Sequence, residues 1–355
     1  MNEYNNLTTG ERATAIQRLT ALWAFCESGL GGVMHALKMP FTGLVIGGLA
    51  VIIISFIAQL SHHNLKELLR SLVIVLIVKA MVSPYTPFPA YIAVSFQALL
   101  GIAVFYLFRI NGLSILLFSI IAMLESAIQQ LLILTLFFGQ SFWKATDRMF
   151  EFVAKQLGIT AVNGSQWVIG IYLLIYVTGG ILIALMSYRI IKHFFSETKN
   201  ILLPEDILQQ SDPGMVKGPE RKRSYHKLWI MAIVMVILSV LLFVFAGNSK
   251  EGWLSVLKTV SWTVSVILAW YLLISPLFTK LILWLLQKKE SRYSEAVSQT
   301  LSFIPVLRRL TAIAWQKSSA YKGWGRWQFF FSTLLHWSLT YSDQTIVTPA
   351  IKEPV

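Results

Sequence analysis

Runs of about twenty apolar residues recur along this chain, and they constrain its fold more than any other feature. A helix that crosses a bilayer needs about 20 such residues, whereas a transmembrane β-barrel would show short segments of alternating hydropathy. Charged residues make up only 13% of the chain, about half their usual share in soluble proteins. The sequence therefore predicts an all-α polytopic membrane protein. In its first half we expect six spans, near residues 19–37, 41–60, 69–82, 90–108, 113–138 and 167–188.

The second half of the chain is less apolar, and it predicts about two further spans. One covers residues 228–246, and we interpret residues 254–286 as a single tilted helix kinked at Pro276, although two half-length helices would also fit. The polar stretch between the halves cannot build a packed core and is typical of a linker. We therefore expect a six-span domain of residues 1–195, a cytoplasmic linker of residues 196–226 and a two-span domain of residues 227–355 that ends in basic amphipathic helices.

Basic residues lie in every second loop, which fixes the expected orientation. Cytoplasmic loops of membrane proteins are enriched in Lys and Arg, so we expect both termini in the cytoplasm. Loops around residues 87, 143 and 248 are then external, and one of them holds an amphipathic helix near residues 142–157. The same rule explains the net charge of +13 without a nucleic-acid partner, and the predicted location is the cell membrane. The cations that define the inner side of the first domain are Arg12, Arg18, Lys66, Arg70, Arg109, Arg189 and Lys192.

Motifs for several kinds of chemistry are absent from the sequence. It has no phosphate-binding loop of the G-x-x-x-x-G-K-[ST] type, no H-E-x-x-H and no nucleophile elbow, so no motif predicts an ATPase or another enzyme. The histidines are scattered, and the adjacent His62 and His63 do not share a helix face. With Cys26 as the only cysteine, we expect no disulfide, no metal and no cofactor.

Polar side chains in or beside the apolar runs are the candidate binding residues. A carboxylate inside a membrane is costly and functional by default, and Glu27 and Glu125 are two such groups. Hydrogen bonds between helices would explain the same polarity, and for Lys79 we favour snorkelling toward the membrane surface. On the functional interpretation, the substrate-binding residues are Glu27, His35, Thr42, Tyr85, Gln97, Glu125 and Gln129.

The stretch between the first two spans, residues 27–50, is rich in glycine. Pro40 prevents a helix from continuing into the second span, and small residues at 42, 43, 47 and 48 let neighbouring helices pack closely. We interpret the stretch as an external loop that covers a binding site, followed by a tightly packed helix. A plain tight turn with a packing motif is the alternative.

Two segments resemble the substrate-binding (S) components of energy-coupling-factor (ECF) importers of vitamins and metals. MPFTGLVIGGLAVI (residues 39–52) resembles their proline- and glycine-rich loop, which leads into a Gly-Gly helix, and VKAMVSPYTPFPAYIAVSFQALLG (residues 78–101) resembles their third-to-fourth helix region. The resemblance covers residues 10–195. It implies a six-helix bundle that binds a small organic nutrient, such as a vitamin or its precursor, from outside and works with separate ATPase subunits. The branch that binds cobalt or nickel through an N-terminal Met-x-His segment is not matched by MNEYNN.

The segment VSQTLSFIPVLRRLTAIAWQKSSAYKGWGRW (residues 297–327) resembles the coupling-helix region of the scaffold (T) component of the same importers. It contains their F-I-P-x-L pattern, and it matches their A-R-G-like docking motif loosely, with Lys in place of Arg and Tyr321 inserted. The resemblance implies two coupling helices separated at Pro305. A basic amphipathic helix on anionic lipid is the alternative. The implied coupling residues are Pro305, Arg308, Arg309, Ala320, Lys322 and Gly323.

Together these features predict a membrane component of an ECF-type importer, in which a substrate-binding bundle is joined to a reduced scaffold. One alternative is a membrane-embedded enzyme that acts on a lipid or polyprenyl substrate, with Glu27 and Glu125 as its carboxylates. Another is a membrane assembly or structural subunit that docks its partners through the basic tail.

Overall fold

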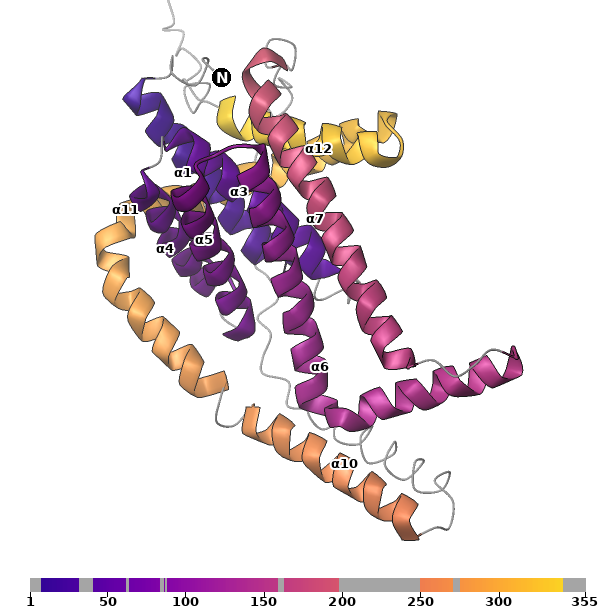
Figure 1. The fold of residues 1–355 in the computed structure, drawn as a ribbon. Coiled ribbons are helices and arrows are strands. Elements are labelled where there is room, and N and C mark those ends of the chain that lie inside the picture. Colours follow the sequence, from indigo (N-terminus) through magenta and orange to yellow (C-terminus); the bar gives the residue numbers. More distant parts are fainter. Residues whose placement is uncertain are drawn as a thin grey trace, which may run out of the picture. The chain divides into compact units, whose positions relative to one another are not determined.

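The computed structural model describes residues 8–31, 41–61, 64–83, 86, 88–158, 163–197, 250–270 and 275–340. These residues form helices joined by turns, and no strand occurs among them (Figure 1). The predicted all-α class is therefore confirmed. The span expected at residues 228–246, the candidates His35 and Tyr85, and most of the expected linker lie outside the described residues.

Some described helices of the first half begin and end close to the predicted spans, whereas α1 begins at Thr9, before the span expected at residues 19–37, and α7 ends at Glu197, beyond the span expected at residues 167–188. α3 and α5 match their predicted spans within two residues at each end. α6 runs past its predicted end because it merges with the expected amphipathic helix across a kink at Gly139. The elements are α1 (Thr9–Phe25), η2 (Cys26–Leu30), α3 (Thr42–Leu60), α4 (Leu65–Val82), α5 (Phe88–Phe108), α6 (Gly112–Gln156), α7 (Gly164–Glu197), α10 (Lys250–Ala269), α11 (Ser275–Lys317), η5 (Ser318–Ala320) and α12 (Gly323–Thr340).

Within the described part of the chain, four helices are long and apolar enough to cross a membrane: α3, α5, α6 and α7. α1 has only 17 residues, and α4 carries the charged residues Lys66, Glu67, Arg70 and Lys79. The chain is thus an all-α membrane protein, while the counts of six and eight spans stay predictions.

Backbone contacts divide the chain into two compact units. Unit 1 contains Met1–Ala127, Leu173–Gln210 and Phe278–Val355, and unit 2 contains Ile128–Tyr172 and Ser211–Leu277. The helices α6 and α7 each contribute one part to each unit. The division into domains of residues 1–195 and 227–355 stays a prediction.

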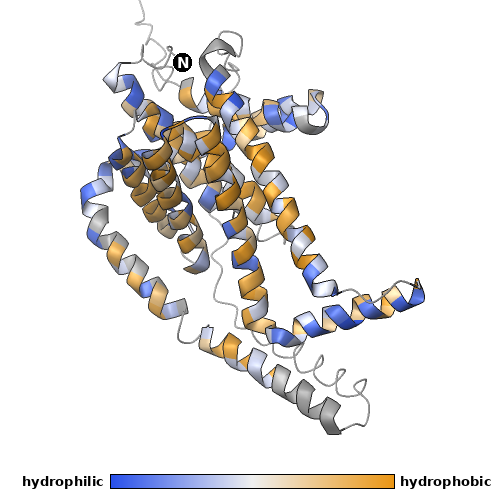
Figure 2. Ribbon diagram, in the orientation of Figure 1, coloured by the Kyte–Doolittle hydropathy of each residue, from blue (hydrophilic) through white to orange (hydrophobic). Residues whose placement is uncertain are grey.

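The core of unit 1 is built around α3, whose side chains are mostly buried among predominantly apolar helices (Figure 2). α1 contacts α3, α4 and α12, and α5 contacts α3 and α4. Glycines bring the backbones of α3, α6 and α7 close together. A Cβ at Gly48 of α3 would lie 2.6 Å from Ile183 Cδ1, and one at Gly180 of α7 would lie 3.1 Å from Ile120 Cα. The prediction that small residues let the second span pack closely is therefore confirmed.

The two proline interpretations in the second half have different outcomes. α10 ends at Ala269 and α11 begins at Ser275, but residues 271–274 lie outside the described residues, so the single kinked helix over residues 254–286 stays a prediction. Pro305, in contrast, does not separate two helices, since α11 continues through it to Lys317. An interior proline removes one helical hydrogen bond and bends the helix. The hydrogen bonds of the neighbouring turns keep α11 continuous through Pro305.

Candidate functional site

A buried ion pair joins the end of the first helix to α4. Lys79 Nζ donates to Glu27 Oε2 at 2.7 Å, and the two side chains are only 4% and 6% exposed. Glu27 lies in η2, which continues α1, and Lys79 lies in the last turn of α4. Separating the charges would leave each one buried and unpaired, so the pair ties η2 to α4. The snorkelling interpretation of Lys79 is therefore wrong, because its ammonium group is neutralised inside the unit.

The carboxylate of this pair is carried by a π turn, η2, a rare helical form that often marks functional sites. The local sequence favours this form. Ser28 Oγ donates to the Ala24 carbonyl at 2.5 Å, which competes with regular helical hydrogen bonding, and Gly29 and Gly31 follow. Ser83, just beyond α4, donates from its Oγ to the Ser28 carbonyl at 3.1 Å. One ionic and one neutral side-chain contact therefore hold the π turn against α4.

A second group of polar side chains meets the glycine face of α3. A Cβ at Gly47 would lie 2.9 Å from Gln97 Nε2 of α5 and 3.6 Å from Ser126 Oγ of α6, and one at Gly43 would lie 3.7 Å from Tyr176 Oη of α7. Gln97 and Tyr176 are both only 3% exposed. Because the glycines have no side chains, polar groups from three helices approach the backbone of α3. We call these five residues the glycine seam.

Glu125 precedes Ser126 on α6 and has a different environment from Glu27. Its side chain is half-buried, and its Oε2 is buried without a hydrogen-bond partner among the described residues. A buried carboxylate oxygen without a donor is costly in an apolar environment. Gln129 is half-buried one turn further along α6. Glu125 therefore places a buried carboxylate oxygen without a described donor next to the glycine seam.

The structure places the predicted binding residues at different points. Glu27 pairs with Lys79, a residue that the sequence-based interpretation had not included in the site. Gln97 lies at the glycine seam. Two other members of the seam, Ser126 and Tyr176, were not predicted. Thr42 is buried as the first residue of α3. Whether the predicted residues line one external cavity stays a prediction.

The predicted coupling residues lie on a helical hairpin formed by α11, η5 and α12. Pro305 and Arg308 are exposed, Arg309 is half-buried, and Ala320 and Lys322 are exposed at the tip. Gly323 is also exposed there and has φ of +56°, a left-handed conformation that favours glycine and turns the chain into α12. The tip thus presents the loosely matched docking motif to the surroundings.

Aromatic and cationic side chains join the two helices of the hairpin. The Arg326 guanidinium lies 4.2 Å from the Trp315 ring centroid, and its Nε donates to Ser318 Oγ at 3.3 Å. The ring centroids of Trp327 and Trp315 lie 5.4 Å apart, so both helices of the hairpin contribute to one aromatic cluster. Cation–π contacts of this kind stabilise a fixed geometry at an exposed site.

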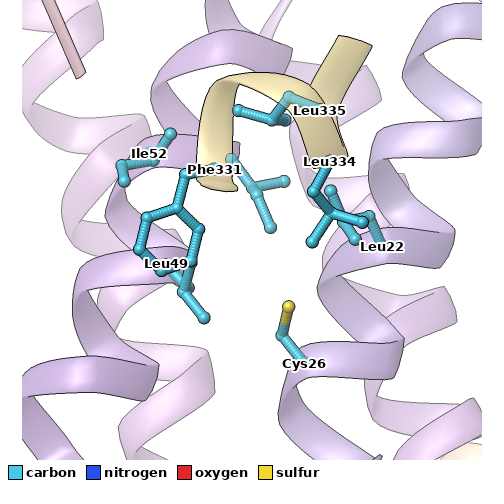
Figure 3. A pocket seen from close by; sticks show the side chains of 8 residues that line it. Leu22, Cys26, Leu49, Ile52, Phe331, Leu334 and Leu335 are labelled. Atoms are coloured by element: carbon cyan, nitrogen blue, oxygen red, sulfur yellow. The ribbon is translucent and has the colours of Figure 1, made fainter. Parts of the chain in front are cut away.

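The last helix, α12, packs against α1 and α3 rather than lying free. Phe331, Leu334 and Leu335 of α12 point toward these helices and line a small apolar cavity (Figure 3). The volume of the cavity is about 10 Å³, the space of about one water molecule, and such apolar cavities stay dry. The cavity therefore reflects packing and does not fit a nutrient. Its other lining residues are Leu22, Cys26, Leu49, Ile52 and Ile53.

Polar contacts attach the same hairpin to the middle of α1. Arg18 Nη1 donates to the Leu339 carbonyl at 2.7 Å, and its guanidinium lies 5.8 Å from the Phe303 ring centroid. Gln17 Nε2 donates to Gln299 Oε1. Buried residues at 330, 334 and 337 recur at helical spacing, and this pattern was the signal from which the packing of α12 could have been predicted.

No protein-family model, no curated protein and no solved structure matches this chain. Its function is therefore inferred from the residues and the geometry of the structure itself.

Proposed function

We propose that this protein is the substrate-binding membrane component of an ECF-type importer, which captures a small organic nutrient from outside and works with separate ATPase subunits. The observation that carries the proposal is the buried Glu27–Lys79 pair at the π turn. Apolar side chains of similar volume would usually stabilise a helical unit at least as well as a buried ion pair. Charged groups inside membrane proteins commonly mark the path of a ligand or an ion.

The glycine seam supplies the neutral polar groups that an organic ligand needs. Gln97 offers an amide, and Ser126 and Tyr176 offer hydroxyls, so the seam contains both donors and acceptors. Sites for small molecules place a few such groups in mainly apolar surroundings. A bundle with this composition can bind a ligand by exchanging contacts between its own helices for contacts to the ligand.

The same geometry weighs against the alternative of a membrane-embedded enzyme that uses Glu27. A general acid or base has to come within hydrogen-bond reach of a proton on the substrate. The Glu27 carboxylate instead accepts from an ammonium group at 2.7 Å and is almost fully buried. The pair is better suited to hold a conformation that ligand binding changes.

Coupling to ATPase subunits is proposed for the hairpin. Residues 296–340 contain five cations and no Asp or Glu, and Arg308 and Lys322 are exposed. A surface of one charge sign fits a partner of the opposite sign and speeds its association. We therefore propose that the hairpin tip docks against an acidic surface of an ATPase subunit, with Arg308, Arg309, Ala320, Lys322 and Gly323 in the coupling roles that the resemblance implies.

The test is to identify small molecules that the full chain retains through purification. The protein is reconstituted in nanodiscs and extracted, and the extracts of wild type, Glu27→Gln and Lys79→Gln are compared by mass spectrometry. We expect the wild type to retain one organic compound, which both variants lose. Glu67→Gln and Lys66→Gln change exposed or half-exposed residues of α4, and these matched controls should retain the compound.

A charge-swapped variant, Glu27→Lys with Lys79→Glu, separates binding from folding. It keeps an ion pair at the same place, so it should fold like the wild type by size exclusion while it still fails to retain the compound. Equal small-molecule content in the wild type and all variants would refute the proposed function.

A further inference from the structure

The segment of α6 beyond Gly139 turns sharply away from the preceding span, as Figure 1 shows. Gly139 has φ of 66° and ψ of −165°, a combination that is essentially restricted to glycine. The apolar run of residues 113–138 ends at this point. We call residues 140–157 the arm; they comprise the rest of α6, which ends at Gln156, and the turn residue Leu157. Since the span ends where the arm begins, the arm starts at the level of the membrane surface.

Two hydrogen bonds fix the direction of the arm, one to the span before the bend and one to the start of α7. Trp143 Nε1 of the arm donates to Thr135 Oγ1 of the span at 3.0 Å. Further along, Asp147 Oδ1 accepts from the Ser165 backbone N–H at 2.7 Å, near the start of α7. These hydrogen bonds lie within unit 2 and hold the bend in one geometry. Specific contacts within this unit therefore hold the arm in its orientation.

The arm has two distinct faces. At 3.6 residues per turn, its five charged residues fall within an arc of about 100°, and Glu151 and Lys155 pair there at 3.1 Å. The opposite side is mainly apolar, with Thr146 and Gln156 as polar exceptions, and Figure 2 shows the change from a mostly apolar span to a segment of mixed hydropathy. Four apolar side chains on that side are exposed, namely Met149 at 65%, Phe152 at 65%, Val153 at 46% and Leu157 at 67%. The charged residues are Lys144, Asp147, Arg148, Glu151 and Lys155.

We propose that the arm binds the lipid bilayer and lies along its interface, with this apolar side between the headgroups and the acyl chains. Three observations select lipid as the occupant: the arm continues a membrane span, its bend sets it across the direction of that span, and its charged residues gather on the side opposite the apolar one. Helices of this kind lie in the plane of the interface. Lys144 and Arg148 lie on the charged side, which faces the headgroups and water. The inference goes beyond the proposed function and does not depend on it.

The experiment measures the surroundings of single spin labels in nanodiscs made of phosphatidylcholine and phosphatidylglycerol. Cys26→Ser removes the native thiol, and labels are attached to Val153→Cys and, as the matched control, to Glu151→Cys on the charged side. Collisions with oxygen report lipid, and collisions with a water-soluble nickel chelate report water. We expect the Val153 label to favour oxygen at a depth of about 5–10 Å and the Glu151 label to favour the chelate.

Two outcomes overturn the proposal. A Val153 label that meets the chelate as often as the Glu151 label does would place the arm in water. An immobile Val153 label that meets neither probe would show that protein covers the apolar side, and dipolar broadening between labels would identify a second copy as that cover. Met149→Cys serves as an independent second position on the apolar side, so that one poorly folding variant does not leave the question open.

Discussion

A double-mutant cycle on the Glu27–Lys79 pair measures how strongly the two charges depend on each other. Lys79→Met leaves the carboxylate buried without its cation, and Glu27→Leu does the reverse. Each change should lower the free energy of unfolding by about 3–5 kcal/mol, the usual cost of breaking a buried pair. The double variant removes both charges, and we expect it to match the wild type or to exceed its stability by about 1–4 kcal/mol. The two positions should therefore be strongly non-additive.

The assay is unfolding in mixed micelles by titration with sodium dodecyl sulfate, followed by tryptophan fluorescence. The exposed pair between Glu67 and Arg70 on the same helix, at 3.8 Å, is the control. Because it is solvated, Glu67→Gln should change the free energy of unfolding by less than about 1 kcal/mol. Additive effects of Lys79→Met and Glu27→Leu would refute the reasoning, since they would mean that the charges do not interact in the folded protein.

Three further predictions concern other parts of the molecule. Gly139→Ala should lower stability by about 1–3 kcal/mol in the same titration, because alanine is strained in that conformation. The hydrogen bond from the Ser165 N–H lowers the pKa of Asp147 below its ordinary value of 3.8, so its stabilisation is present above that pH and is lost as the pH falls through the lowered pKa. The protection of amides at the start of α7, measured relative to their intrinsic exchange rate at each pH, should therefore fall on acidification in the wild type more than in Asp147→Asn. Lys322→Glu should abolish copurification of ATPase subunits, whereas Lys317→Glu should weaken it only slightly.

The positions of the apolar helices could be predicted from the sequence because hydropathy and length are local properties. α3 and α5 begin and end within two residues of their predicted spans for this reason. The close packing of α3 also followed from local composition, since glycines that allow helix contact are visible in the sequence. The kink at Gly139 was not predicted as such, although the amphipathic helix beyond it was.

The partner of Glu27 could not be predicted in the same way. Lys79 lies 52 residues further along the chain, and its place near a helix end was equally compatible with snorkelling. The pairing depends on which side of η2 faces α4, and that direction is set by a π turn whose sequence signal, a serine followed by glycines, is weak. Ser126 and Tyr176 were missed for a related reason, because only the packing of α6 and α7 on α3 brings them to the glycines of α3.

The C-terminal hairpin and the ion pair are connected through a single helix. Arg18 donates to the Leu339 carbonyl from the middle of α1, and Cys26 contributes to the cavity beneath α12. Glu27 follows Cys26 directly, and α1 passes into η2 without leaving helical backbone angles. Interfaces packed in this way shift between discrete arrangements rather than deforming continuously. A partner that displaces the hairpin would therefore act on α1 itself and reach the Glu27–Lys79 pair without an intervening loop.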